Sequence, residues 1–397
     1  MKKLNLLFAG LLVCGALFMS SCNETNDNPV KPTNTTGIPN DADAKPNPIL
    51  DPSSLNTTIP NFNWTYSYEN GELVIRLDLT GVKDPYTDDW VELYGMESAK
   101  QNIWVSVDGI SKGFTIEKIN DQKKGTVDMI FLVDNSTSMR EEAEGVAKEI
   151  KKYANELNSK MDILFGCVGY GRYVGYEYDY PKNNYGVSGA LNLSSYEQLD
   201  AFLNQRGKTG VDRTVGYFGD DANKLSSAAA KDEYYKSGGE NSIQALRFAD
   251  ENFSFTTGAN RVYVNFTDDA NYPGGNKNIS ISYVENTETW PVYKGTIHSV
   301  ISNSEDIIIN RSKQVSDAEL SYLPSDYTGG TKIFVPSDFS GVSLSSLPVT
   351  GALLNSYIIR FRNVPLDGRV HEVWLTVKST SPNGEILADK KSEVIFQ

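Results

Sequence analysis

Three oxygen-bearing side chains follow one apolar stretch of the sequence. Residues 127–133 read Val-Asp-Met-Ile-Phe-Leu-Val, and Asp134, Ser136 and Ser138 come directly after them as an Asp-x-Ser-x-Ser pattern. A carboxylate and two hydroxyls on one tight turn suit a hard divalent cation, Mg²⁺ or Mn²⁺, with Ca²⁺ as an alternative. Such a small ligand set leaves coordination positions that an outside group can fill. These residues therefore predict a metal site that is open to a partner.

The structural setting of this turn allows a second role. A continuous apolar run is typical of a strand buried on both faces, and open α/β sheets bind ligands at the carboxyl ends of their strands. In the alternative, Ser136 or Ser138 caps a following helix by accepting hydrogen bonds from its free N–H groups. The residues of the turn alone leave both roles open.

Two later stretches place polar residues in a comparable setting. Residues 238–241 read Gly-Gly-Glu-Asn and precede a helical stretch, and residues 261–266 form a strand pattern that ends in Thr-Asp-Asp. In order and spacing, the three stretches resemble a von Willebrand factor type A (vWA) domain with a metal-ion-dependent adhesion site. The resemblance favours the metal site over the cap.

The resemblance also implies roles for single residues. The cation would be held by Asp134, Ser136 and Ser138, with Asp268 as a second carboxylate that reaches it through water. Glu240 stands where the vWA pattern has a threonine, although integrin β subunits also use an acidic residue in this loop.

Residues 240 and 241 therefore have two sets of roles. Glu240 binds the cation directly or through water, with Asn241 as the neighbouring candidate ligand. Alternatively, Asn241 caps the following helix, and Glu240 lies in its first turn.

The elements around these motifs indicate a doubly wound, mostly parallel α/β sheet of the vWA, Rossmann-like type. Ala143, Val146, Ala147, Ile150, Ala154 and Leu157 form one helical stripe, and residues 161–169 form the next buried strand. A strand, a helix and a strand in this order make a βαβ unit. Further strands are predicted at 295–301 and 328–335, and helices at 196–203, 317–323 and 344–354; residues 207–236 have no clear assignment.

Strand patterns without helical periodicity flank this region. They lie at residues 73–79, 103–109 and 114–119, and again at 357–362 and 370–377, where the last two suggest a hairpin across Asp367-Gly368. We expect 60–122 and 355–397 to combine into one β-sandwich-like domain with the vWA-like domain, 123–354, inserted between them, as in integrin β subunits. Separate β segments packed on the inserted domain are the alternative.

The first residues resemble a bacterial lipoprotein signal. Lys2-Lys3 precede an apolar stretch, and small residues lead to Cys22, which predicts a signal peptide over 1–22 with lipidation at Cys22. Plain secretion is the alternative. Residues 23–59 are rich in Asn, Thr, Pro and Asp and predict a disordered tether. The protein would be lipid-anchored in the bacterial cell envelope, at the outer membrane or cell surface.

Composition limits the classes of function. The formal net charge of -14 argues against nucleic acid and against any membrane contact beyond the lipid anchor. The chain has two histidines, no phosphate-binding Gly-rich loop and no zinc-type Cys/His cluster, so we expect no enzymatic activity. A tyrosine-rich stretch that includes Tyr173, Tyr176 and Tyr178 either binds a partner or packs a small core of its own.

These observations predict a binding protein. The metal site would accept an acidic residue from a partner protein in adhesion or surface assembly. The alternative is a non-enzymatic envelope scaffold in which the metal is structural or absent.

Overall fold

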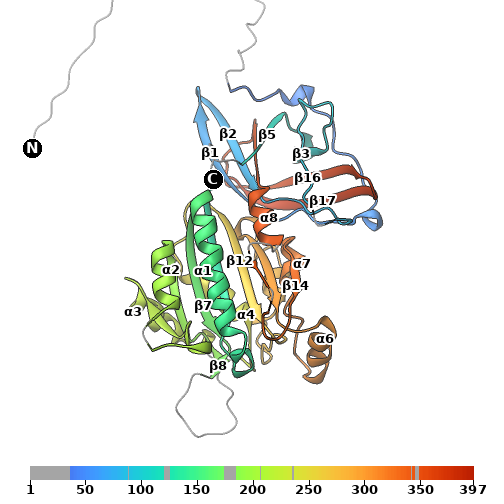
Figure 1. Ribbon diagram of the computed structural model, residues 1–397. Helices are drawn as coiled ribbons and strands as arrows, with labels where there is room; N and C mark the ends of the chain where they lie inside the picture. Colours follow the sequence, from blue (N-terminus) through green and yellow to red (C-terminus); the bar gives the residue numbers. More distant parts are fainter. Residues whose placement is uncertain are drawn as a thin grey trace, which may run out of the picture. The chain divides into compact units, whose positions relative to one another are not determined.

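The central sheet contains seven strands in the order β11-β10-β7-β6-β12-β13-β14 (Figure 1). In this computed structural model the described residues are 36–397 except 88, 120–125, 174–184, 206, 235–236, 341 and 345–347. The strands are β6 (Thr126–Asp134), β7 (Asp162–Tyr170), β10 (Gly189–Ser194), β11 (Gly216–Phe218), β12 (Asn260–Thr267), β13 (Thr296–Ile301) and β14 (Lys332–Phe334). From β7 to β14 all neighbours are parallel, whereas β10 is antiparallel to β7. The predicted mostly parallel sheet is confirmed.

Helices cover both faces of this sheet because β6 is apolar on both sides. Met129 and Phe131 belong to a core shared with α1 and α8, whereas Ile130 and Leu132 belong to a core shared with α3 and α4. The helices are α1 (Ala143–Lys160), α2 (Tyr196–Leu203), α3 (Ala222–Ala229), α4 (Ser242–Asn252), α5 (Ser282–Glu285), α6 (Glu305–Gln314), α7 (Leu323–Thr328) and α8 (Pro348–Leu354). All six residues of the predicted stripe on α1 are buried.

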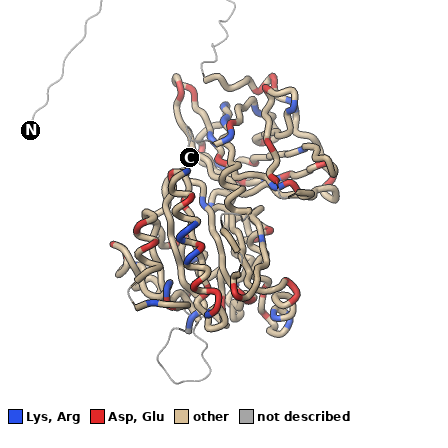
Figure 2. The backbone as a smooth tube through the Cα atoms, viewed as in Figure 1, with Lys and Arg blue, Asp and Glu red and all other residues tan. Residues whose placement is uncertain are grey.

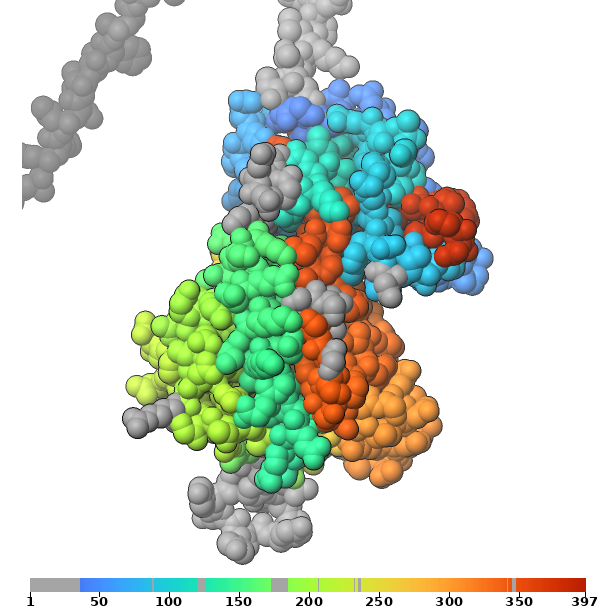
Figure 3. All heavy atoms as spheres, in the orientation of Figure 1, coloured from blue at the N-terminus to red at the C-terminus, as the bar shows by residue number. Residues whose placement is uncertain are grey.

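The segment that leads into α8 runs along α1, as the orange-red and green surfaces of Figure 3 show. Phe339 lies on Gly145 of α1, where an added Cβ would come within 3.2 Å of the Phe339 Cβ. Along α1 acidic and basic positions are interspersed (Figure 2), which is typical of a solvated helix face.

The flanking β domain consists of two four-stranded antiparallel sheets, β1-β2-β15-β5 and β17-β16-β3-β4. Its strands are β1 (Phe62–Glu69), β2 (Glu72–Leu79), β3 (Ile103–Val107), β4 (Ile110–Ser111), β5 (Phe114–Lys118), β15 (Tyr357–Arg362), β16 (Val370–Ser381) and β17 (Gly384–Ile395). One apolar core contains residues of both sheets, among them Leu77, Val105, Ile359 and Leu375. Strands from before and after the α/β region pair with each other, since β15 lies between β2 and β5 and β16 pairs with β3.

Two predictions about local structure were wrong. Strands β15 and β16 do not form a hairpin, because they belong to different sheets and β16 instead pairs along its whole length with β17. The helix expected at 317–323 is absent from these described residues: Glu319 forms an isolated bridge with Asn271, and α7 begins only at Leu323. Helix α6 was not predicted.

Residues 36–59 differ from the expected flexible tether. They contain two short 3₁₀ helices, η1 (Asp41–Asp43) and η2 (Pro52–Ser54). Asp41 Oδ2 lies 3.2 Å from Lys112 Nζ, and Asn56 exchanges hydrogen bonds with the backbone of Leu387 and Glu385 in β17. Specific polar contacts therefore fix a segment whose composition alone suggests disorder.

No helix among the described residues is long and apolar enough to cross a membrane. The predicted signal peptide, Cys22 and residues 23–35 lie outside the described residues, as do Tyr176 and Tyr178. Tyr173 lies in the two-residue strand β8 (Arg172–Tyr173), which pairs with β9 (Tyr185–Gly186).

Candidate metal centre

Asp134 is the last residue of β6 and the most buried of the candidate ligands on that turn, with 1% of its surface exposed. Its Oδ1 accepts a hydrogen bond from the Ser136 backbone N–H at 2.8 Å, and its Oδ2 accepts one from the Thr267 hydroxyl at 2.8 Å. Thr267 ends β12, the parallel neighbour of β6. The parallel pairing therefore brings the carboxyl ends of both strands, and their polar residues, together.

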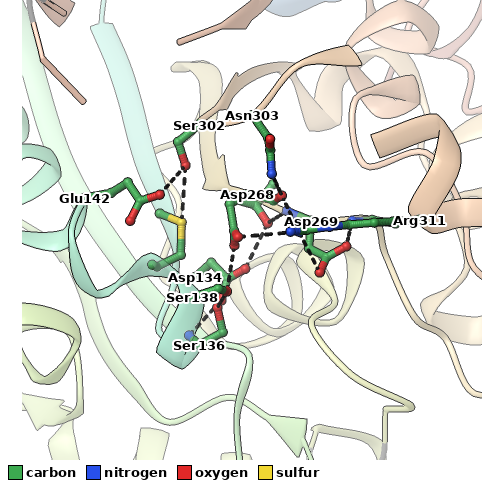
Figure 4. Close-up of polar contacts among 12 residues, drawn as sticks. Asp134, Ser136, Ser138, Glu142, Asp268, Asp269, Ser302, Asn303 and Arg311 are labelled. Atoms are coloured by element: carbon green, nitrogen blue, oxygen red, sulfur yellow. Dashed lines mark hydrogen bonds and ion pairs between the residues drawn. The ribbon is translucent and has the colours of Figure 1, made fainter. Parts of the chain in front are cut away.

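The two serines connect Asp134 to a second carboxylate (Figure 4). Ser136 Oγ lies 2.9 Å from Ser138 Oγ, and the Ser138 hydroxyl donates to Asp268 Oδ1 at 3.0 Å. Ser136 occupies the N-cap position of the short helix η3 (Thr137–Arg140), yet its side chain makes no cap hydrogen bond. The two hydroxyls are thus adjacent and that of Ser138 contacts Asp268, and the cap alternative finds no support at Ser136.

Glu240 borders the same point from another loop. Gly171 has a φ of +76°, and an added Cβ there would lie 2.5 Å from Asp134 Oδ1 and 3.3 Å from Glu240 Cγ. The Glu240 carbonyl accepts the Tyr272 backbone N–H at 2.9 Å, which fixes the loop beside the end of β12. Glycine is required at 171 because any side chain would displace one of the two acids.

The side chain of Asn241 is engaged in other hydrogen bonds. Its side-chain oxygen accepts from the Gln244 N–H at 2.9 Å, and its amide donates to the Ile279 carbonyl at 2.9 Å. It is the N-cap of α4, as in the alternative considered for this residue. Because both its polar atoms are engaged, we leave Asn241 out of the ligand set.

A positively charged side chain from outside the predicted motifs, that of Arg311, also contacts the acidic residues of the centre. Arg311 of α6 places Nη1 2.9 Å from Asp269 Oδ2, 3.5 Å from Asp268 Oδ2 and 2.8 Å from the Asp268 carbonyl (Figure 4). The Tyr272 hydroxyl donates to the other oxygen of Asp269 at 2.8 Å. Sequence reasoning missed Arg311, because α6 was not predicted and nothing near residue 311 matches a motif.

A further acidic side chain near the centre was also missed. Glu142, which is 3% exposed, accepts a hydrogen bond from the Ser302 hydroxyl at 3.1 Å. Burial raises the pKa of Glu142. The Glu142 carboxyl therefore lies in an environment that disfavours its charge.

The same holds for the three acidic residues predicted as ligands. Burial raises the pKa of Asp134 well above its usual range, and the charges of Glu240 and Asp268 raise it further. Burial also raises the pKa of Glu240 to about 7, with a contribution from Asp269 and Asp268. At Asp268 burial raises the pKa even though Ser138 and Arg311 oppose the shift. A bound cation would relieve this repulsion.

The donor set fits a hard divalent cation. Every candidate atom is a carboxylate or hydroxyl oxygen, the ligand type of Mg²⁺ and Mn²⁺. Ser138 is exposed, so an outside group can approach from that side. Among the described residues no three His, Cys, Asp or Glu side chains are grouped to hold a metal on their own, so binding here would depend on the serine hydroxyls.

The two histidines lie elsewhere. His298 in β13 is 3% exposed, and its Nδ1 accepts the Thr331 backbone N–H at 3.1 Å. Burial lowers its pKa to about 3, so it is a neutral, packed strand residue. Cys167 is a buried free thiol.

No protein-family model matches the chain, and no curated protein matches its sequence. Among solved structures, an aerotolerance-related membrane protein from Bacteroides fragilis aligns at 14% identity over 57% of this chain and 98% of its own, with a TM-score of 0.30. The manganese-loaded TRAP protein of Plasmodium vivax aligns at 9% identity over 70% of this chain and 97% of its own, with a TM-score of 0.29.

An adhesive tip pilin from Group B Streptococcus agalactiae aligns at 17% identity over 37% of this chain and 46% of its own, with a TM-score of 0.23. TM-scores this low carry no argument about function.

Proposed function

We propose that this protein is a cell-envelope lipoprotein whose vWA-like domain binds a partner protein through a divalent metal site. Asp134, Ser136 and Ser138 would hold the cation, with Asp268 and Glu240 completing its surroundings. The role would be adhesion or surface assembly. Mg²⁺ or Mn²⁺ is the expected ion, and Ca²⁺ is the alternative.

One observation carries this proposal. The oxygens of Asp134, Ser136, Ser138 and Asp268 come from two neighbouring strand ends, the two hydroxyls lie within hydrogen-bond distance of each other, and that of Ser138 also reaches Asp268. Hydrogen bonds from Ser136 N–H and Thr267 hold the Asp134 carboxylate in place. Preorganised oxygens cost little conformational entropy when a ligand binds.

The chemistry suits recognition better than catalysis. A bound cation would supply a positive charge that attracts a carboxylate from a partner. With few carboxylates in direct contact, that charge would stay largely uncompensated, and Ser138 is exposed on the approach side. Glu240 as a direct ligand would weaken the attraction, so in this proposal Glu240 acts through water. We propose no enzymatic activity.

Calorimetric titration of Mg²⁺, Mn²⁺ and Ca²⁺ into residues 23–397 tests the proposal, with Asp134→Ala as the matched variant. We expect saturable binding by the wild type and none by the variant. The absence of binding by a folded wild-type protein would refute the metal-dependent function.

The second candidate is an envelope scaffold in which the metal is structural or absent. It is favoured by the close pairing of strands from both ends of the chain around the α/β region. Ser136→Ala separates the two candidates. If this variant loses the metal but still binds the partner, the scaffold is correct; if both are lost, the metal mediates the contact.

The location rests on the first residues of the chain. Lipidation at Cys22 would anchor the protein in the envelope, at the outer membrane or the cell surface. Metabolic labelling with a fatty acid, compared between wild type and Cys22→Ala, tests this part of the proposal. Label in the wild type alone is the expected result.

A further inference from the structure

Arg311 is the one described cationic side chain that contacts the acidic residues after β12. Its guanidinium bridges Asp268 and Asp269, and the same Nη1 donates to the Asp268 carbonyl. The residue reaches the centre from α6, which carries none of the predicted ligands. Its position raises the question of what it does when a cation binds.

We infer that Arg311 is a built-in counter-ion for Asp268 and Asp269 and that it lowers the affinity of the centre for a divalent cation. This inference rests on the proposed metal site. Without metal, the guanidinium balances part of the acidic charge that burial makes unfavourable at Asp268. With metal, the same guanidinium repels the incoming ion, because like charges a few ångströms apart interact strongly at a partly buried site.

The geometry supports competition rather than a purely structural role. Asp268 uses Oδ1 to accept from Ser138 at 3.0 Å, whereas Arg311 lies at its Oδ2, so the two contacts divide the carboxylate. The Arg311 side chain is 32% exposed, so it can turn toward solvent when the carboxylate shifts toward a cation. Asp269, at 2.9 Å, would retain the guanidinium nearby.

Arg311 would also affect the partner that approaches the bound cation. A second positive charge near the cation favours an anionic group on the partner. It would also make cation binding weak enough to respond to the concentration of the ion, since each competing charge reduces the net gain on binding.

The experiment is a Mn²⁺ titration of residues 23–397, followed by the paramagnetic signal of the free ion at low and high salt. Arg311→Gln removes the charge, Arg311→Lys keeps it, and Lys313→Gln removes an exposed charge from the same helix as a matched control. We expect Arg311→Gln to bind Mn²⁺ about tenfold more tightly at low salt, with a smaller gain at high salt. The other two variants should stay close to wild type.

The outcomes separate this inference from the proposed function. If wild type binds Mn²⁺ and Arg311→Gln binds it equally or more weakly, the counter-ion role is wrong and the metal site stands. If neither protein binds Mn²⁺, both are refuted. Binding by Arg311→Gln alone would support the counter-ion role but refute the metal-dependent function of the wild type.

A second measurement, thermal denaturation, tests the inference even if Arg311→Gln is less stable than wild type. The Tm of Arg311→Gln without metal should fall below that of wild type, and Mn²⁺ should raise it by a larger increment. In an Asp269→Asn background the effect of Arg311→Gln should shrink, because the acid that holds the guanidinium is gone. An undiminished effect would contradict the inference.

Discussion

The pKa values of two acidic clusters in this protein are shifted in opposite directions. At the end of the central sheet, Asp134 faces Glu240 and Asp268, and the pKa of each carboxyl is raised, first by burial. In the β domain, Asp108 and Asp367 both contact His371, and the pKa of each carboxyl is lowered, first by a hydrogen bond, from His371 to Asp108 and from Arg369 to Asp367.

The second cluster contains its own cations. His371 Nδ1 lies 2.7 Å from Asp108 Oδ2, and its Nε2 lies 3.0 Å from Asp367 Oδ1. Burial lowers the pKa of His371, but hydrogen bonds and charge from both aspartates outweigh burial and raise it overall. This cluster joins the turn after β3 to the start of β16. Its acidic side chains are paired with positively charged side chains of the same chain.

The difference indicates which cluster serves stability and which serves binding. Groups that are paired in the folded chain stabilise it, whereas charges that repel each other in a buried place persist where function requires them. Among the residues that the structure describes, the first cluster has one partial counter-ion, Arg311, for its acids. A cation from outside could balance the remaining charge, as the metal proposal assumes.

The largest expected effect is at Asp134. Asp134→Asn should weaken Mn²⁺ binding by about 100-fold or more, because it removes the carboxylate that the strand end holds in place. The same change should raise the free energy of unfolding in EDTA by about 1 kcal/mol, since a neutral amide of the same shape ends the repulsion with Glu240. Urea denaturation with and without metal measures both, and a metal-free variant less stable than wild type would contradict the comparison.

Glu240 should control how metal-free stability depends on pH. Its pKa rises from 4.5 to about 7 in the folded protein, so the folded state binds more protons than the unfolded state between these values, and stability falls as pH rises through this window. Glu240→Gln should flatten that decline. Thermal denaturation in EDTA from pH 4 to 8 measures it, and an equally steep decline in the variant would assign the effect to other carboxyls.

The sequence predicted the first cluster better than its surroundings. The continuous apolar run of β6 and the polar residues after β6 and β12 locate Asp134, Ser136, Ser138 and Asp268, because parallel strands end at one edge. Arg311 could not be found in this way, since it depends on where α6 packs. The Gly-Gly-Glu-Asn stretch at 238–241 also could not decide between a ligand role and a cap role for the side chain of Asn241.

Tertiary pairing limited the predictions in the β domain. Strands β15 and β16 were recognised from their composition, but no local pattern shows that they belong to different sheets. Similarly, residues 36–59 are polar and rich in turn-forming types, yet Asp41 and Asn56 find partners more than 70 and 320 residues away. Local propensity carries no information about such contacts.

His371 tests the satisfied cluster. Because its pKa is raised above 6.5, its contribution to stability is fully present below that value and is lost as pH rises through the folded pKa. His371→Gln should therefore lower the Tm by a few degrees near pH 6 and by less at alkaline pH. Parallel melts of both proteins from pH 5 to 9 measure the gap. A gap that widens with pH would show that packing against Phe396, not charge, is what the residue contributes.

Asn241 gives the smallest effect and the finest separation between stability and binding. Asn241→Ala should cost about 1 kcal/mol of folding stability, because the Gln244 N–H at the start of α4 loses its acceptor. Asn241→Ser keeps a capping oxygen and should recover most of this loss. Neither change should alter the Mn²⁺ affinity of the folded protein by more than about twofold, a limit set by small indirect shifts of Glu240. Asn241 would return to the ligand set only if both variants bound Mn²⁺ much more weakly while Asn241→Ser remained as stable as wild type, because such a result cannot come from the helix cap.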